Sequence, residues 1–218
     1  MPLIKKIFAG TIQPIIAKKI YRTSYYKWKD ITLRIPPGVF HPKYFFSTKY
    51  LLKYVLQLDI KNKNLLELGA GNGLISIACT KQGAKVTATD VSKRVIETLH
   101  ENTKSNKAEI TIIESDLFDQ IPKQQFDIIA INPPYYPKTP KNELEKAWYC
   151  GEHFEYFEKL FYQLKLYLHG ETILLMVLSE DCNLEKIFAI AKKNGFNFTL
   201  AQSKTFYWEK NFIFNIHL

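Results

Sequence analysis

The sequence predicts an α/β fold with a mostly parallel sheet that is covered by helices on both faces. From residue 64 onward, short apolar segments typical of buried strands alternate with longer segments of helical periodicity. Gly83 and Gly195 follow two of the helical segments, at the position where glycine commonly ends a helix. Such alternation is the pattern of parallel strands that are joined by crossover helices.

The order of these segments defines the expected architecture. Strands are expected at residues 65–68, 85–89, 110–113, 126–131 and 172–178, and helices at residues 74–82, 92–103, 152–168 and 184–194. Residues 196–202 and 212–218 are expected to pair antiparallel and to close the sheet. The total of seven strands, with helices between them, corresponds to a Rossmann-like sheet.

A basic extension is expected to precede this domain, with the boundary between residues 1–35 and residues 36–218. Residues 1–34 hold eight lysines and arginines against one acid, which leaves 22 basic and 20 acidic residues in the rest. Apolar residues recur at helical spacing over residues 1–20. Docking of this amphipathic segment on its own domain is the first interpretation, and contact with a membrane surface or with RNA are the alternatives.

Two further segments lie between this amphipathic part and the first strand of the sheet. Residues 31–35 alternate between apolar and polar side chains and predict a short strand. A helix is expected from about residue 47 to residue 58, with Ser47 or Thr48 as its cap.

The bulk composition favours a cytoplasmic protein without a metal centre. The chain has three cysteines that lie far apart and show no metal-ligand spacing. Widely spaced, unpaired cysteines fit a reducing compartment. No apolar run approaches the roughly 18 residues that a membrane span needs, and no signal-peptide cleavage site is evident.

A glycine-rich turn follows the strand at residues 65–68. The sequence Glu67-Leu68-Gly69-Ala70-Gly71-Asn72-Gly73 places glycines between a strand and a helix, where backbone is expected to approach a ligand closely. In the dinucleotide fingerprint the third glycine falls at position 74, but here it comes one residue earlier, at Gly73. The turn therefore predicts a ligand without a pyrophosphate, although a purely structural turn also uses glycine.

Acidic side chains follow the next two expected strands. Asp90 comes 19 residues after Gly71, where an acid is placed to accept hydrogen bonds from ribose hydroxyls. A helix cap from Asp90 or Ser92 is the alternative reading of this position. Asp116 follows the strand at residues 110–113, and is expected to accept a hydrogen bond from an exocyclic amine or to be a solvated loop acid.

The sequence Asn132-Pro133-Pro134-Tyr135 follows the strand at residues 126–131. Two prolines remove two backbone donors and hold the chain extended. A side-chain amide, free carbonyls and a flat ring remain at the sheet edge where ligands bind in α/β folds. This motif predicts a site for a planar nitrogen that donates hydrogen bonds, and a plain turn is the alternative.

From about residue 36 to its end, the chain resembles the class I S-adenosylmethionine-dependent methyltransferases. The segment from Glu67 to Gly73 is similar to their cofactor motif, and Asp90 and Asp116 are similar to their ribose-side and adenine-side acids. Residues 132–135 are similar to the motif of the subgroup that methylates planar nitrogens. This resemblance implies S-adenosyl-L-methionine as the cofactor, with Glu67, Gly69, Gly71, Gly73, Asp90 and Asp116 as binding residues.

The resemblance also implies a substrate, but it leaves the class of substrate open. Ala147-Trp148-x-x-Gly151 resembles relatives of the release-factor glutamine methyltransferases, and Pro37-Gly38-Val39-Phe40 resembles ribosomal RNA guanine-N2 methyltransferases. The first reading is therefore an enzyme of the glutamine methyltransferase type. The alternatives are an rRNA or tRNA adenine-N6 or guanine-N2 methyltransferase, and a non-catalytic cofactor-binding module.

The expected mechanism uses the motif at residues 132–135 as the acceptor half of the site. The Asn132 oxygen and the Pro133 carbonyl are expected to accept the two N–H groups of the target nitrogen. This would localise the nitrogen lone pair, while the Tyr135 ring stacks on the planar group. No histidine is expected to act as a catalytic base.

Overall fold

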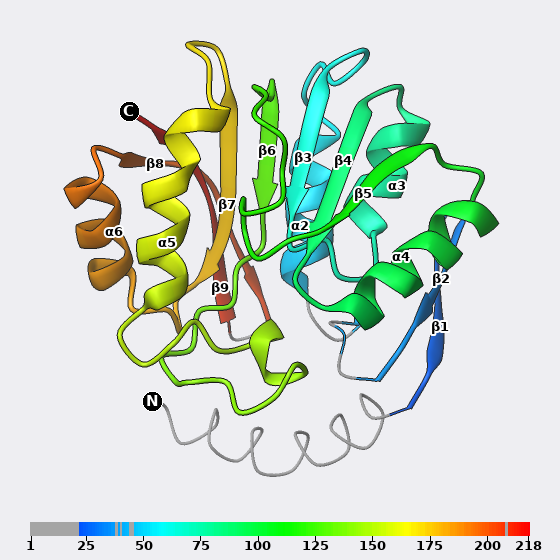
Figure 1. Cartoon of the computed structure of the whole chain (residues 1–218), viewed down its shortest axis with the longest axis horizontal. Helices are drawn as coiled ribbons and strands as arrows, with labels where there is room; N and C mark the ends of the chain where they lie inside the picture. Colours follow the sequence, from blue (N-terminus) through cyan, green and yellow to red (C-terminus); the bar gives the residue numbers. More distant parts are fainter. Residues whose placement is uncertain (1–21, 38, 40, 44–45, 208) are drawn as a thin grey trace.

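The computed structural model describes residues 22–37, 39, 41–43, 46–207 and 209–218. Its elements, drawn in Figure 1, are β1 (Ser24–Trp28), β2 (Ile31–Ile35), α2 (Phe46–Val55), β3 (Asn64–Leu68), α3 (Leu74–Lys81), β4 (Lys85–Asp90), α4 (Lys93–Ser105), β5 (Ile110–Glu114), β6 (Ile128–Ile131), η1 (Glu145–Ala147), α5 (Glu155–Leu164), η2 (Lys165–Tyr167), β7 (Ile173–Ser179), α6 (Leu184–Lys193), β8 (Asn197–Phe206) and β9 (Glu209–His217). The amphipathic segment expected at residues 1–20 lies outside the described residues.

The predicted seven-stranded, mostly parallel sheet is confirmed. Its strand order is β5-β4-β3-β6-β7-β9-β8, and only β9 runs antiparallel to its neighbours β7 and β8. From β3 the chain moves outward through β4 and β5, and then returns to place β6 on the other side of β3. The strand order therefore reverses between β3 and β6, and the carboxyl ends of these strands flank the point where ligands bind in open α/β sheets.

Helices cover both faces of the sheet, as Figure 1 shows. Alternate residues of the central strands supply two separate apolar clusters, because successive side chains point to opposite faces. Leu65, Ile128 and Ala130 pack with residues of α2, α3 and α4 on one face. Leu66, Ile129 and Ile131 pack with residues of α5 and α6 on the other. Burial on both faces explains why these strands are almost continuously apolar in the sequence.

The strand expected at residues 31–35 is β2, and it forms a hairpin with β1, which the sequence analysis did not predict. The side-chain amide of Asn106 binds both the N–H of Thr32, at 3.0 Å, and the Thr32 carbonyl, at 2.8 Å. The amide of Asn102 does the same for Arg34, at 2.8 and 2.9 Å. Asn102 of α4 and Asn106, the C-cap residue of the same helix, thus satisfy the outer edge of β2 and fix the hairpin to the domain.

The hairpin also belongs to the apolar core. Ile31, Leu33 and Ile35 are buried in the cluster that contains α2, α3 and α4. The domain boundary at residue 35 stays a prediction, but residues 31–35 pack as part of the same core as the sheet. Within the described residues, no helix is long and apolar enough to cross a membrane.

Several element boundaries differ from the predicted ones. The helix expected at residues 152–168 begins only at Glu155, because Gly151 and Phe154 have positive φ angles of 90° and 66°. It becomes a 3-10 helix at Lys165. The helix expected from residue 47 to 58 is α2, which ends at Val55, and its Thr48 lies inside the first turn and not at a cap. The closing antiparallel pair is longer than predicted, since β8 extends to Phe206.

Candidate active site

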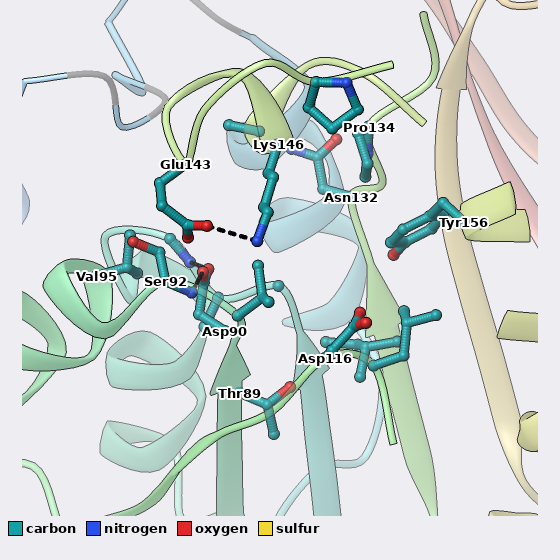
Figure 2. Close-up of a pocket in the computed structure, with 18 of the residues that line it drawn as sticks. Thr89, Asp90, Ser92, Val95, Asp116, Asn132, Pro134, Glu143, Lys146 and Tyr156 are labelled. Atoms are coloured by element: carbon teal, nitrogen blue, oxygen red, sulfur yellow. Dashed lines mark hydrogen bonds and ion pairs between the residues drawn. The ribbon is translucent and has the colours of Figure 1, made fainter. Parts of the chain in front are cut away.

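A cavity of about 370 Å³ opens at the carboxyl edge of the sheet, where the strand order reverses. The loops after β3, β4, β5 and β6 form its floor and sides, the first turn of α5 forms another wall, and residues between 134 and 151 contribute to its rim. Figure 2 shows side chains from these separate segments converging on this space. Most of the residues singled out in the sequence line this cavity.

The glycine-rich turn forms the floor of the cavity after β3. Gly69 and Gly73 have φ angles of 75° and 80°, a region that side chains with a Cβ rarely adopt. The Ala70 N–H donates to the Thr89 carbonyl at 2.7 Å, which ties the turn to β4. A Cβ on Gly69 would meet no atom within 4 Å, so the backbone there faces open space. The turn thus presents bare backbone to a ligand.

Glu67 lies beneath this turn and is 5% exposed. Its Oε2 accepts a hydrogen bond from the Ser76 N–H, at 2.8 Å, and another from the Ser76 hydroxyl. Burial raises the pKa of Glu67 to about 8, and the nearby Asp90 adds to this rise, although the bonds from Ser76 lower it. A cation in the cavity would offset the buried charge, so the site favours a positively charged ligand.

Asp90 ends β4 and uses both carboxylate oxygens to order neighbouring loops. Its Oδ2 accepts from the Gly71 N–H and its Oδ1 from the Ser92 N–H, both at 3.1 Å. Burial raises the pKa of Asp90, while these backbone hydrogen bonds lower it. Ser92 occupies the N-cap position of α4 without a side-chain capping bond. Each Asp90 oxygen has further lone pairs, so it is able to accept bonds from a ligand as well.

Asp116 lies at another side of the cavity, after β5. Its Oδ2 forms an ion pair with Lys159 of α5 at 2.7 Å, and its side chain is 58% exposed. Lys159 also binds Asp119, at 2.6 Å. Leu117, which follows Asp116, has a positive φ of 54°. Strained backbone of this kind is concentrated at functional sites. Figure 2 shows the Asp116 side chain at the wall of the cavity.

Tyr156 faces this acid from α5 and was not predicted as a site residue. Figure 2 shows its ring at the wall of the cavity, with the hydroxyl directed inward. Burial raises the pKa of Tyr156 above its ordinary value, and the charges of Asp90 and Asp116 add to the effect. The hydroxyl therefore stays protonated near neutral pH. The position of Tyr156 in the helix after β6, at the ligand-binding edge, is the signal that would have identified it.

The motif after β6 supplies the upper part of the cavity. Asn132 and Pro134 line it, whereas Pro133 and Tyr135 do not. This division follows from the extended chain, in which successive side chains point to opposite sides. The Asn132 Nδ2 donates to the Thr48 hydroxyl of α2 at 3.1 Å. In the described part of the chain, the Asn132 Oδ1 accepts no hydrogen bond, so it is available to a ligand.

Tyr135 instead packs against the apolar cluster beneath α5 and α6. Its ring lies 4.8 Å from the ring of Tyr136, centroid to centroid. Burial raises the pKa of Tyr135 far above its ordinary value, so the phenol stays protonated. The predicted stacking of Tyr135 on a substrate stays a prediction, and the structure places its ring beside the cavity and not in its lining.

The segment over the cavity mouth was also not predicted. The Tyr136 N–H donates to the Trp148 carbonyl and the Cys150 N–H to the Tyr136 carbonyl, at 3.1 and 3.0 Å, so these bonds close the loop between them. Inside the loop, Lys146 pairs with Glu143 at 2.5 Å, and both side chains reach down toward Asp90 in Figure 2. The loop therefore adds charged groups of both signs to the cavity rim.

The described residues contain no cluster of three or more histidine, cysteine or acidic side chains that could hold a metal ion. Cys79, Cys150 and Cys182 are buried free thiols. The cavity is lined by carboxylates, cationic side chains, amides, hydroxyls, the Cys150 thiol and backbone groups.

Comparison with known proteins gives a family and several relatives. The methyltransferase small domain model matches residues 30–207. A Methanocaldococcus jannaschii protein named as a protein N5-glutamine methyltransferase is 33% identical over 77% of this chain and 86% of its own length. A Bacteroides thetaiotaomicron release factor glutamine methyltransferase is 32% identical over 57% of this chain, but this match covers only 46% of that enzyme.

A solved structure supports the fold. A 16S rRNA N2 methyltransferase of T. Thermophilus, solved in complex with AdoMet and guanosine, superposes with a TM-score of 0.63. The superposition covers 89% of this chain and 50% of that chain, at 18% sequence identity. At this identity the similarity shows that the two chains share a fold.

Proposed function

The chain belongs to the methyltransferase small domain family, and we propose that it methylates the side-chain amide nitrogen of a glutamine in a protein. It is an S-adenosylmethionine-dependent methyltransferase, as its family and fold show. The observation that carries the proposed substrate chemistry is the orientation of Asn132. Its nitrogen is held by Thr48, and its oxygen is left without a partner among the described residues, at the cavity wall.

The lower part of the cavity fits the cofactor. S-adenosylmethionine supplies, when bound, an electrophilic methyl group on a positively charged sulfur. Asp90 would accept hydrogen bonds from the ribose hydroxyls, and Asp116 would accept one from the adenine amine. Glu67 would balance the positive charge of the ligand, which explains why an acid is retained in a buried position. The bare backbone at Gly69 and Gly71 would let the ligand approach closely, whereas Gly73 does not line the cavity and a Cβ there would meet Leu99.

Asn132 and Pro133 would act on the acceptor nitrogen. An amide nitrogen is a weak nucleophile because its lone pair is delocalised into the carbonyl group. Hydrogen bonds from its two N–H groups to the Asn132 Oδ1 and the Pro133 carbonyl would hold it with the lone pair directed at the methyl group. The new N–C bond replaces the S–C bond, and the nitrogen then loses one proton to water. No strong base is required, and the protonated Tyr135 does not provide one.

A protein substrate is favoured by the Methanocaldococcus jannaschii relative, whose name specifies protein glutamine and which this chain covers over most of its length. RNA is the second candidate, as an adenine-N6 or guanine-N2 target. The eight basic residues in residues 1–34 support it, since phosphate neutralisation drives nucleic-acid binding.

Under either candidate, we propose a cytoplasmic location, which the free thiols of all three cysteines support. A contact between residues 1–34 and a membrane surface is a third, weaker use of the same charge.

Transfer of tritium from labelled cofactor into fractionated cell extract tests the proposal. We expect label in the protein fraction, in a release factor or a similar substrate, and loss of this label when Asn132 is replaced by alanine. Label that is recovered in RNA and removed by ribonuclease would favour the second candidate. Absence of transfer, together with retained cofactor binding, would favour a non-catalytic module.

A further inference from the structure

We propose that Thr48 is a positioning residue that holds the Asn132 amide with its oxygen directed at the acceptor nitrogen. This inference rests on the proposed function, because it assigns a partner to the residue that binds the substrate amide. Thr48 belongs to α2, 84 residues before Asn132 in the chain, and no sequence motif connects the two residues. Its hydroxyl and the Asn132 amide meet at the upper part of the cavity, and both residues line it.

The direction of the hydrogen bond decides what the amide offers to a substrate. The Asn132 Nδ2 donates to the Thr48 Oγ1 at 3.1 Å, so the amide nitrogen is directed at α2. Because the amide is planar, its oxygen lies on the opposite side. With the amide reversed, its NH₂ group would face the N–H groups of the substrate, and two donors cannot form a hydrogen bond. The Thr48 hydroxyl is able to donate as well as to accept, so Thr48 holds the amide in the acceptor orientation together with the N–H groups of the substrate, which only the Asn132 oxygen is able to accept.

Thr48 supplies the partner that the Asn132 side-chain amide needs. The terminal torsion of an asparagine side chain has a broad, roughly two-fold energy profile, so the amide needs a fixed partner to keep one orientation. Pro133 and Pro134 follow Asn132 and have no N–H groups, so this backbone does not compete with the substrate for the Asn132 oxygen.

Thr48 is suited to this role by its surroundings. It is 8% exposed, and Leu51, Leu52 and Val55 anchor the rest of α2 in the apolar core with no exposed surface. The β-branch of threonine restricts the rotation of its side chain in a helix. A rigid helix and a restricted side chain together hold the hydroxyl at one place, which a flexible loop residue would not do.

Three variants separate this role from general stability. Thr48→Val keeps the shape of the side chain and removes the hydroxyl, Thr48→Ser keeps the hydroxyl, and Ser47→Ala is a control on the same helix. At saturating cofactor we expect Thr48→Val to lower kcat by about 10- to 100-fold, because a small misplacement of a reacting group costs up to this factor. Thr48→Ser is expected to restore kcat to within about threefold of wild type. Ser47→Ala is expected to leave it unchanged.

The side-chain amide of Asn132 gives a readout that does not depend on turnover. Its two N–H signals in a ¹⁵N correlation spectrum are identified by their loss in Asn132→Ala. In the wild-type protein we expect one of these protons to exchange with water more slowly than the other. In Thr48→Val, both protons are expected to exchange rapidly, and in Thr48→Ser the slow proton is expected to return.

The outcomes distinguish this inference from the proposed function. Full activity in Thr48→Val, together with an inactive Asn132→Ala, would overturn the role of Thr48 and leave the function of Asn132 intact. Full activity in Asn132→Ala would overturn the proposed function itself. If Thr48→Val does not fold, the exchange of the two Asn132 protons in the wild-type protein decides the matter, since equal and rapid exchange would refute the hydrogen bond.

Discussion

Glu67 makes the stability of the ligand-free protein depend on pH in a way that one substitution removes. The carboxyl is 5% exposed and its pKa is about 8, whereas the ordinary value is 4.5. Glu67→Gln keeps an oxygen that accepts from Ser76, but it has no charge to bury. The wild-type protein and this variant therefore differ mainly in the ionisation of one side chain.

The sign and size of the effect follow from the raised pKa. Because the folded state holds the proton more tightly than the unfolded chain, Glu67 does not oppose folding below pH 4.5 and opposes it increasingly as the pH rises to 8. Each pKa unit corresponds to about 1.4 kcal/mol, so the penalty is about 3 kcal/mol at pH 7 and about 5 kcal/mol above pH 8. These values are large relative to the ~5–15 kcal/mol that stabilises a typical domain.

Urea unfolding of both proteins from pH 5 to pH 9 measures this difference directly. We expect the free energy of unfolding of Glu67→Gln to exceed that of the wild type by the smallest amount near pH 5, by an increasing amount toward pH 8, and by a nearly constant amount above it. Comparison of the two proteins cancels the contributions of the other titrating groups. If the difference in free energy of unfolding between the two proteins stays constant from pH 5 to pH 9, Glu67 is not held protonated by burial.

Three further substitutions test the site and its support. Asp90→Ala is expected to weaken cofactor binding about 100-fold in calorimetry, because it removes a charged acceptor worth roughly 3 kcal/mol. Asn102→Ala is expected to lower the free energy of unfolding by about 3 kcal/mol and to weaken cofactor binding, since its amide also donates to the Asn72 carbonyl in the glycine-rich turn, at 3.0 Å. Gly73→Ala is expected to cost about 2 kcal/mol, because a Cβ there would lie 2.7 Å from Leu99 Cδ2.

The first two of these predictions have a matched comparison. Asp59→Ala removes an exposed acid that does not line the cavity and should leave the cofactor dissociation constant unchanged. Asn106→Ala should lower stability as Asn102→Ala does, but it should spare cofactor binding, because its amide bonds join α4 only to β2 and to its own helix. Equal cofactor affinity in Asn102→Ala and wild type would contradict the proposed link to the turn, and an unchanged thermal midpoint in Gly73→Ala would contradict the clash.

The strand ends were predictable because they depend on local patterns. The central strand β6 is continuously apolar, so Asn132, the first polar residue after it, marks the edge where a ligand binds, and Asp90 marks the same edge as the acid that ends β4. The same reasoning placed the glycines of the turn between a strand and a helix. Parallel connectivity then brought these separate segments to one edge of one sheet.

The remaining parts of the site depend on contacts that no local pattern encodes. Thr48 meets Asn132 across 84 residues, and its sequence context indicated only a helix start. Tyr156 lines the cavity from the first turn of α5, a helix that begins later than the sequence predicted. For Tyr135, the residue type suggested stacking, but the alternation of an extended chain after β6 directs its ring away from the cavity lining.

The most direct test of the central claim is to locate the transferred methyl group. A release factor incubated with the enzyme and the cofactor would be digested and sequenced by tandem mass spectrometry. We predict the added mass of one methylene group on a glutamine side chain, and no addition with Asn132→Ala under conditions in which this variant still binds the cofactor. A methyl group on another residue type, or on the glutamine with Asn132→Ala at the wild-type rate, would contradict the account.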